Sequence, residues 1–293
     1  MLSIAGSDSG GGAGIQADLK AFACCGVHGM TAITAVTAQN TVAVTGVYPL
    51  PPEAIVEQVR AVVEDIGVDA VKIGMLGTAE TIAAVDRALD LVGDVPVVLD
   101  PVMVAESGAR LLDKDAEGRI RGLLLPRVTV VTPNLPEAEV LAEGADPAEV
   151  PAENGPEARA EPRPADVPAE TGPANVPADT GERGHEELAR AVHSLGPEVV
   201  VITGGHRQEA TDLFFDGERL VELPGERYPD GASHGSGCTH SSALAANLAL
   251  GRQPLEAARE AKKIAAEAVR DGLRGLGRGA GPVDVLARRL SEP

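Results

Sequence analysis

The chain of 293 residues has no tryptophan, few other aromatic residues and only three cysteines. Those cysteines are Cys24, Cys25 and Cys238, and an odd number with two adjacent members excludes a disulfide framework. Neither a CxxC pair nor an HExxH sequence occurs, so we expect no built-in zinc site. Hydrophobic residues, by contrast, make up 44% of the chain, which indicates a globular protein with a sizeable core.

Positive charge is also scarce, since 25 Lys and Arg residues face 44 Asp and Glu residues and leave a net charge of −19. Such a chain repels nucleic-acid phosphates and anionic lipid, so neither nucleic acid nor a membrane is an expected partner. No apolar run approaches the roughly 18–20 residues of a membrane span. The N-terminus lacks the basic start and long apolar stretch of a signal peptide. We therefore expect a soluble, cytoplasmic protein.

Lysine accounts for only five of the basic residues. An acid excess combined with scarce lysine resembles proteins of salt-loving organisms. A GC-rich genome together with one acidic insert would give the same composition, and this alternative stays open.

Short apolar or β-branched segments alternate with segments of helical period, which predicts an α/β fold whose central, mainly parallel sheet is flanked by helices. The expected strands are residues 2–6, 28–41, 70–76, 95–104, 128–134 and 199–205. The expected helices are residues 13–26, 51–67, 78–93, 185–196, 238–251 and 254–273. Residues 210–225 read as a hairpin whose turn is Asp216-Gly217.

Residues 144–184 break this alternation, because they hold eight of the 22 prolines and no Leu, Ile, Met or aromatic residue. Such a composition cannot bury enough apolar area to offset its chain entropy. We expect a disordered insert rich in Pro, Ala and acid, within a single domain made of residues 1–143 and 185–293. A partner-binding role for the insert is the alternative.

The first loop, AGSDSGGGAGIQAD (residues 5–18), joins a strand to a helix through glycines, as phosphate-binding loops do. It matches neither the Walker A pattern nor GxGxxG. We interpret it as a loop that lets the backbone approach a small ligand, with Asp18 as a nearby polar contact. A flexible turn is the alternative.

Two further stretches place polar residues at the ends of expected strands. Gln39 in TAQNT offers a donor and an acceptor suited to a heteroaromatic amine, and a polar strand end is the alternative. Asn134 and Glu137 in NLPE, with Asp100 at another strand end, could hold hydrated Mg²⁺. NLPE also fits a helix capping box, and the pattern alone does not decide between the two.

The stretch HGSGCT (residues 234–239) places a glycine turn before a helix that starts near Cys238. Successive N–H groups at Gly235, Ser236 and Gly237 would form an anion site able to stabilise a transferring phosphoryl group. The helix dipole is expected to lower the pKa of the Cys238 thiol, which could then accept a proton. A small buried cysteine that merely begins a helix is the alternative.

Seven motifs occur along the chain in this order: SIAGSDSGGGAGIQADLK, TAQNT, VKIGMLG, VLDPVMV, TPNLPEAEVL, GGH and HGSGCT. With these motifs the chain closely resembles the hydroxymethylpyrimidine/phosphomethylpyrimidine kinases of thiamine biosynthesis, in the ribokinase-like superfamily. The resemblance covers residues 2–143 and 185–285. It implies a three-layer fold, a homodimer, and transfer of phosphate from ATP with Mg²⁺, first to the hydroxymethylpyrimidine and then to its monophosphate. It implies that the pyrimidine is bound by Gln39, Asp18, Gly6, Met75 and Val102.

The resemblance further implies that Gly235, Ser236 and Gly237 form the anion hole and that Cys238 occupies the position of the catalytic base. Thr203 and Gly205 would lie at the nucleotide, where the family commonly has a lysine in place of Thr203. Ser233 and Ser236 each stand where the family usually has threonine. The rival functions are a pyridoxal/pyridoxine kinase and a non-catalytic pyrimidine-binding protein.

Overall fold

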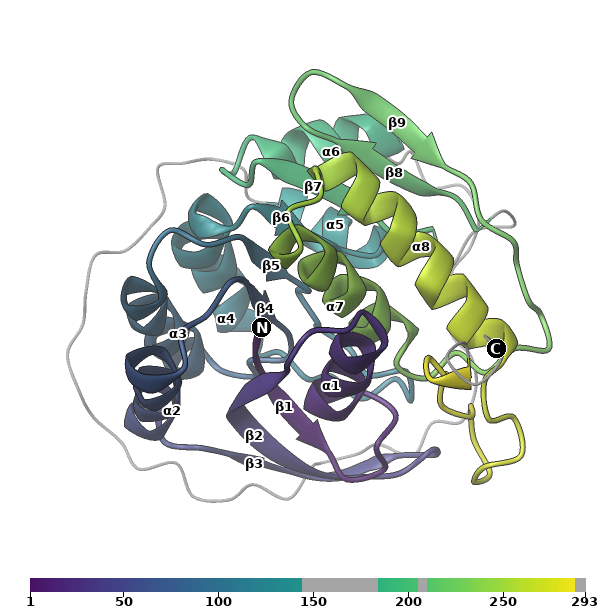
Figure 1. Cartoon of the computed structure of the whole chain (residues 1–293), viewed down its shortest axis with the longest axis horizontal. Coiled ribbons are helices and arrows are strands. Elements are labelled where there is room, and N and C mark those ends of the chain that lie inside the picture. The colour runs from purple at the N-terminus through teal and green to yellow at the C-terminus, as the bar shows by residue number, and fades with distance from the viewer. Residues whose placement is uncertain (144–183, 205–209, 288–293) are drawn as a thin grey trace.

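The computed structural model describes residues 1–143, 184–204 and 210–287 (Figure 1). Within these ranges nine strands form one sheet in the order β3-β2-β1-β4-β5-β6-β7-β8-β9. The strands are β1 (Leu2–Asp8), β2 (Met30–Gln39), β3 (Val44–Pro49), β4 (Val71–Ile73), β5 (Val97–Leu99), β6 (Val130–Val131), β7 (Val199–Ile202), β8 (Asp212–Phe215) and β9 (Leu220–Leu223). The pairings from β2 through β7 are parallel, and those of β3, β8 and β9 are antiparallel.

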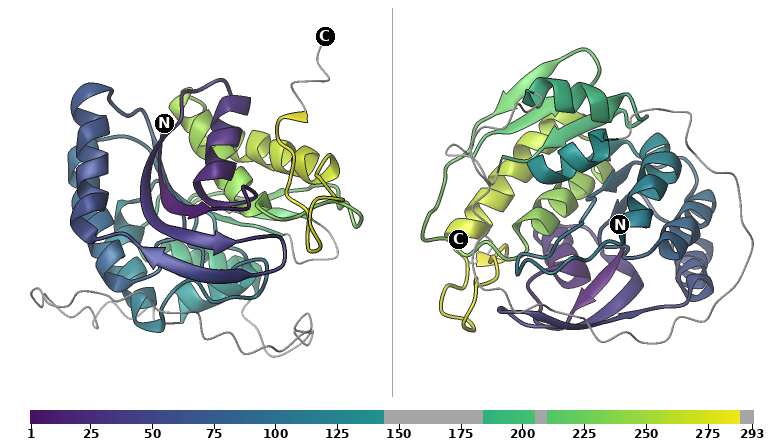
Figure 2. Two further views of the ribbon diagram at one scale, coloured as in Figure 1. Left: turned by 90° about the horizontal axis from the view of Figure 1, so that it is seen from below. Right: turned by 180° about the vertical axis from the view of Figure 1, so that it is seen from behind.

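Helices cover both faces of the sheet and give three layers (Figures 1 and 2). One face carries α1 (Gly14–Cys24), α7 (Ser236–Ala249) and α8 (Pro254–Arg270). The other carries α2 (Pro52–Asp65), α3 (Ala79–Val92), α4 (Lys114–Arg119), α5 (Leu135–Ala142) and α6 (His185–His193). A π-helical turn, Ile120–Leu124, and a 3₁₀ turn, Leu125–Arg127, follow α4.

The central strands are apolar throughout because each of their faces meets a helical layer. In β5, Val97 and Leu99 pack with α2–α6, whereas Val98 packs with α7 and α8. Successive side chains of a strand point to opposite faces, so a strand buried on both sides shows no polar alternation.

The expected α/β fold with a mainly parallel sheet is thus confirmed, as is the hairpin of β8 and β9. The sequence analysis did not predict β3 or the helical turns of residues 114–127. The expected disordered insert lies outside the described residues except for Gly184, and Gly205 lies outside them as well. No helix in the described ranges is long and apolar enough to cross a membrane.

The parallel arrangement brings distant residues to one edge of the sheet. Asp8 and Gln39 end β1 and β2, Asp100 follows β5, Asn134 follows β6, and α7 begins at the same edge. In open α/β sheets the ligand site lies outside the carboxyl ends of the parallel strands.

Candidate active site

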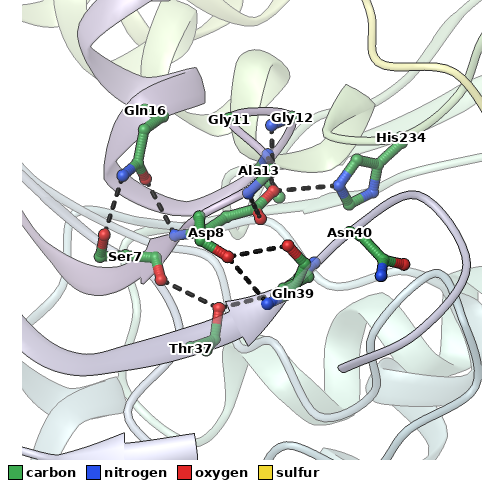
Figure 3. A network of polar contacts seen from close by, with 12 residues as sticks. Ser7, Asp8, Gly11, Gly12, Ala13, Gln16, Thr37, Gln39, Asn40 and His234 are labelled. Atoms are coloured by element: carbon green, nitrogen blue, oxygen red, sulfur yellow. Dashed lines mark hydrogen bonds and ion pairs between the residues drawn. The ribbon is translucent and has the colours of Figure 1, made fainter. Parts of the chain in front are cut away.

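The carboxylate of Asp8 ties the glycine loop to a segment 226 residues away (Figure 3). It accepts hydrogen bonds from the N–H groups of Gly10, Gly12 and Ala13 at 2.7, 3.0 and 2.8 Å. Its Oδ2 atom lies 3.1 Å from Nε2 of His234. Burial alone would raise the pKa of Asp8, but these hydrogen bonds, that of His234 above all, outweigh it and lower the pKa. Asp8 is therefore an ionised clamp between two loops.

Close backbone packing joins the same two loops. Gly235 has φ +84° and stands directly before α7, and a side chain there would clash with the carbonyl oxygen of Gly12. A side chain at Gly12 would in turn clash with the His234 ring. At Gly235 both the left-handed backbone and the close approach exclude a Cβ, whereas at Gly12 the close approach of the His234 ring alone opposes one.

The first turn of α7 contains no acidic side chain, and the first N–H groups of a helix have no partner within the helix. The Ser236 amide donates to the carbonyl oxygen of Ser233 at 3.0 Å, so it holds the turn together. The amides of Gly237 and Cys238 follow it, and a Cβ added at Gly237 would point into open space. The predicted anion hole thus lies at a helix N-terminus, where the helix dipole is positive, and its binding of an anion stays a prediction.

The predicted lowering of the Cys238 pKa is wrong. The side chain is half-buried, and loss of hydration raises the pKa of the thiol to about 12, with Lys72 opposing and Asp100 and Asp18 adding to the rise. At neutral pH Cys238 is a protonated thiol.

Lys72 is a buried lysine in β4, beneath the start of α7. Its Nζ lies 2.8 Å from Oδ1 of Asp18 and 3.9 Å from Oδ2 of Asp100. Burial alone would lower the pKa of Lys72, but the negative charges around it, that of Asp18 first, outweigh burial and raise the pKa. Lys72 is therefore a permanent cation held between two carboxylates.

Asp18 is fully buried in this network. Besides Lys72, it accepts hydrogen bonds from the hydroxyl groups of Ser3 and Ser242 at 2.6 and 2.8 Å. It is absent from the lining of the open cavity described next, so its predicted contact with the substrate stays a prediction.

Gln39 lines a cavity of about 230 Å³. The walls are the turn of residues 39–42, the loop at 106–107, His234 and residues 279–280. The side-chain oxygen of Gln39 accepts a hydrogen bond from Thr37 at 3.2 Å, while its backbone N–H and carbonyl both bond the Ser9 hydroxyl at 2.8 Å. Asn40 accepts from the amides of Val42 and Ala43 and so shapes the turn.

The other three predicted substrate residues lie close to the strand ends. A Cβ on Gly6 would lie only 2.8 Å from the methyl group of Met75, so glycine lets that side chain pack against β1. Met75 is buried, and its carbonyl accepts a hydrogen bond from Thr34 at 2.8 Å. Val102 follows Asp100 and is half-buried.

Asn134 and Glu137 form the capping box that was left open as an alternative. Asn134 accepts from the Glu137 amide, and Glu137 accepts from the Asn134 amide, both at 2.9 Å. Burial and the nearby charge of Asp100 raise the pKa of Glu137 to about 8, and burial raises that of Asp100. Carboxylate and amide oxygens are ligands that Mg²⁺ prefers, although the part of the chain that the structure describes brings no three His, Cys, Asp or Glu side chains together as a metal cluster.

Thr203 lies beside Asn134, and its N–H donates to the Pro133 carbonyl at 2.9 Å. The Gly204 amide donates to Asp212 at 2.8 Å, and the predicted nucleotide residue Gly205 lies outside the described residues.

Asp8, His234 and Lys72 are the functional candidates that the sequence analysis missed. Lys72 had a usable signal, because a lysine within the apolar strand VKIGML must find a buried partner. Asp8 and His234 had none, since only the fold brings them together.

A mainly parallel sheet between two helical layers, with a small cavity beside the segment that precedes α7, is the architecture of the ribokinase-like class of small-molecule kinases. A model of the family described as phosphomethylpyrimidine kinase matches residues 8–158 and 175–284. The chain belongs to this family.

The chain is 46% identical over 286 residues to hydroxymethylpyrimidine/phosphomethylpyrimidine kinase of Rhizobium meliloti, covering 96% of this chain and 95% of that protein. Pyridoxal kinase of Staphylococcus aureus in complex with ADP has a TM-score of 0.79 at 31% identity, with 99% of this chain and 94% of that chain covered. Phosphomethylpyrimidine kinase of Clostridium difficile 630 has a TM-score of 0.69 at 34% identity, with 92% and 98% covered.

Proposed function

We propose that the protein transfers the γ-phosphoryl group of ATP to 4-amino-5-hydroxymethyl-2-methylpyrimidine and then to the resulting monophosphate, in thiamine diphosphate biosynthesis. The observation that carries the proposal is the cavity at Gln39, which opens beside His234 and the anion site at the start of α7. A ring held there would lie next to a phosphoryl group held by the amides. The names of close relatives support the same reaction.

In this proposal Gln39 recognises the aminopyrimidine, with Gly6, Met75, Val102 and Asp18 shaping the inner site. The turn of Gly235, Ser236 and Gly237 and its neighbour Cys238 would face the charge that develops on the transferring group, with the Ser236 N–H fixing the turn through the Ser233 carbonyl. N–H donors fixed before the reaction stabilise that charge without reorganisation. Cys238 stands at the predicted position of the base, and its raised pKa makes the neutral thiol the resting form.

Asn134, Glu137 and Asp100 would hold Mg²⁺, which supplies charge neutralisation for the nucleotide phosphates when bound. The capping box holds Glu137 in place, and the buried carboxyl groups favour a cation between them. Thr203 and Gly205 would contact the nucleotide. A homodimer, as implied by the family resemblance, completes the proposal.

Pyridoxal kinase is the second candidate function, because several pyridoxal kinase structures resemble this chain with TM-scores of 0.78–0.79. Pyridoxal and the pyrimidine are both substituted heteroaromatic rings with a hydroxymethyl group. The non-catalytic alternative has lost its support, since the chain belongs to a family of kinases.

The test is ADP release by the purified protein with Mg²⁺-ATP and either the hydroxymethylpyrimidine or pyridoxal, with products identified by mass. Two successive additions of phosphate to the pyrimidine are expected. Gln39→Ala should raise the pyrimidine KM while the KM for ATP stays near its original value. Phosphorylation of pyridoxal alone would overturn the proposed substrate, and ligand binding without ADP release would overturn the proposed activity.

A further inference from the structure

The segment after α8 contains the last motif of the chain, GRGAGP (residues 277–282), and forms a closed loop. The Leu273 amide donates to the Pro282 carbonyl at 2.9 Å, so the two ends of the loop meet. We call residues 274–281 the C-terminal loop, which is drawn in yellow beside the end of the β2–β3 hairpin (Figures 1 and 2). Gly279 and Ala280 of this loop line the cavity opposite Gln39.

Thr41, at the tip of the β2–β3 hairpin, holds the C-terminal loop in place. Its Oγ1 accepts hydrogen bonds from the amides of Arg278 and Gly279 at 3.2 and 3.3 Å. A side chain at Gly277 would clash with the Thr41 side chain, and one at Gly279 would clash with the Thr41 carbonyl. The glycines of the loop and this threonine are therefore complementary in shape and in hydrogen bonding.

The other end of the loop pairs with His234. The His234 amide donates to the Gly281 carbonyl at 3.2 Å, and the Val283 amide donates to the His234 carbonyl at 3.0 Å. Since His234 is also clamped to Asp8, this end is anchored beside the anion site. Thr41 provides the matching attachment on the side of the pyrimidine cavity.

We propose that Thr41 is a positioning residue that seats the C-terminal loop as the outer wall of the pyrimidine cavity. The wall thereby sets which heteroaromatic alcohol fits. This inference rests on the proposed function. A wall of Gly279 and Ala280 presents mainly backbone, so its position depends on the attachments of the loop and not on side-chain bulk. Releasing it widens the cavity, which weakens binding of the small pyrimidine more than that of a larger pyridine ring.

The kinetic test compares Thr41→Val, which removes the acceptor but keeps the shape, with Thr41→Ser, which keeps the hydroxyl. Thr45→Val is the matched control, because the Thr45 hydroxyl on the same hairpin bonds only the Ala38 carbonyl, at 3.0 Å. Thr41→Val should raise the pyrimidine KM about tenfold, with the KM for ATP changed less than twofold. The ratio of kcat/KM for pyrimidine over pyridoxal should fall. Thr41→Ser and Thr45→Val should both stay near the original values.

The second readout needs no activity. Trypsin cleavage of the Arg278–Gly279 bond, followed individually by mass spectrometry, should be several-fold faster in Thr41→Val. Bound pyrimidine should slow this cleavage in the original protein, whereas ATP alone should not.

If Thr41→Val leaves both the cleavage rate of the Arg278–Gly279 bond and the pyrimidine KM unchanged, Thr41 does not position the C-terminal loop and the proposal is refuted. An equal rise in the KM for ATP would show that the loop is no specific wall of the pyrimidine cavity. If the original protein neither turns over the pyrimidine nor is protected by it, the proposed substrate and the wall's role fail together. Faster cleavage of Thr41→Val would in that case still show that Thr41 holds the C-terminal loop in place.

Discussion

Asp8→Asn is expected to destabilise the fold and to slow phosphoryl transfer, because it breaks the clamp between the glycine loop and the segment that precedes α7. Oδ1 of Asp8 accepts from Gly10, and Oδ2 accepts from Gly12, Ala13 and His234. An amide offers one oxygen and one NH₂ group, so in either orientation its NH₂ faces an N–H donor. Hydrogen bonds to a charged group contribute about 1.5–3 kcal/mol each, and we expect a total loss of about 2–4 kcal/mol.

The free energy of unfolding, measured in urea between pH 7 and about pH 2, checks both the magnitude and its cause. The pKa of Asp8 is lowered in the folded protein. Its charge therefore contributes stability that is fully present above the unfolded pKa of about 3.9 and is lost as the pH falls through the lower folded value. The difference between the original protein and Asp8→Asn should be constant from pH 7 to about pH 5 and shrink at lower pH.

The same variant should lower kcat more than tenfold while the KM for ATP changes little, since the anion site loses its position relative to the cavity. Asp113→Asn is the control, because Asp113 is an exposed residue before α4 whose side chain forms no capping hydrogen bond. An Asp8→Asn protein with the original stability and the original kcat would refute the clamp.

Three further outcomes follow from the buried charges and the composition. Lys72→Met should lower the free energy of unfolding in urea by about 3–5 kcal/mol, because it leaves the Asp18 carboxylate buried without its cation. An unchanged urea concentration at the midpoint of unfolding would contradict the stabilising ion pair of Lys72 and Asp18. Alkylation of Cys238 by iodoacetamide, followed by mass, should accelerate about tenfold per pH unit from pH 7 to 10, since the thiolate is rare below the raised pKa of about 12. A rate that levels off below pH 9 would contradict this. Molar KCl should raise the melting temperature, because salt screens the repulsion within a chain of net charge −19; a melting temperature independent of KCl would count against the halophile interpretation.

The layers of the fold were predictable because local signals agree with the final packing. Uninterrupted apolar runs such as VPVVL predict strands buried on both faces, and helices beginning at Pro52 and Pro254 carry their own start signals. Strand β3 was missed because VTGVYP combines glycine and proline, which suit an edge strand but resemble a turn. The irregular helical turns at 114–127 follow tertiary contacts more than any local pattern.

The site was predictable where one motif carries it and unpredictable where two distant segments meet. Gln39 lies at the end of a strand and the glycine turn lies directly before a helix, as their local sequence predicts. The Asp8–His234 pair spans 226 residues, and each member alone resembles an ordinary loop residue. The pKa of Cys238 was mispredicted for the same reason, because the packing that removes water from the thiol and the carboxylates of Asp100 and Asp18 that add to the rise come from other elements.

The raised pKa of Cys238 suggests what a thiol contributes at the proposed position of a base. The floor of the site already holds two carboxylates, Asp18 and Asp100, against the single cation Lys72. A further negative charge about 4 Å from an incoming phosphate would cost about 4 kcal/mol at an effective dielectric constant of about 20. A neutral thiol avoids that repulsion and leaves charge stabilisation to the amides of α7.

A loose phosphoryl-transfer transition state needs little early proton abstraction, and the phosphate acceptor of the second proposed step needs no strong base at all. Cys238→Ser, which is neutral and similar in size, should therefore keep kcat within about tenfold in both steps. Cys238→Asp should lower kcat more than 100-fold. The full repulsion of about 4 kcal/mol would give a larger loss than this, since each factor of ten in rate corresponds to about 1.4 kcal/mol. The reverse order, with aspartate active and serine inactive, would show that the site needs a charged base at this position and that the thiolate, despite its pKa, supplies it.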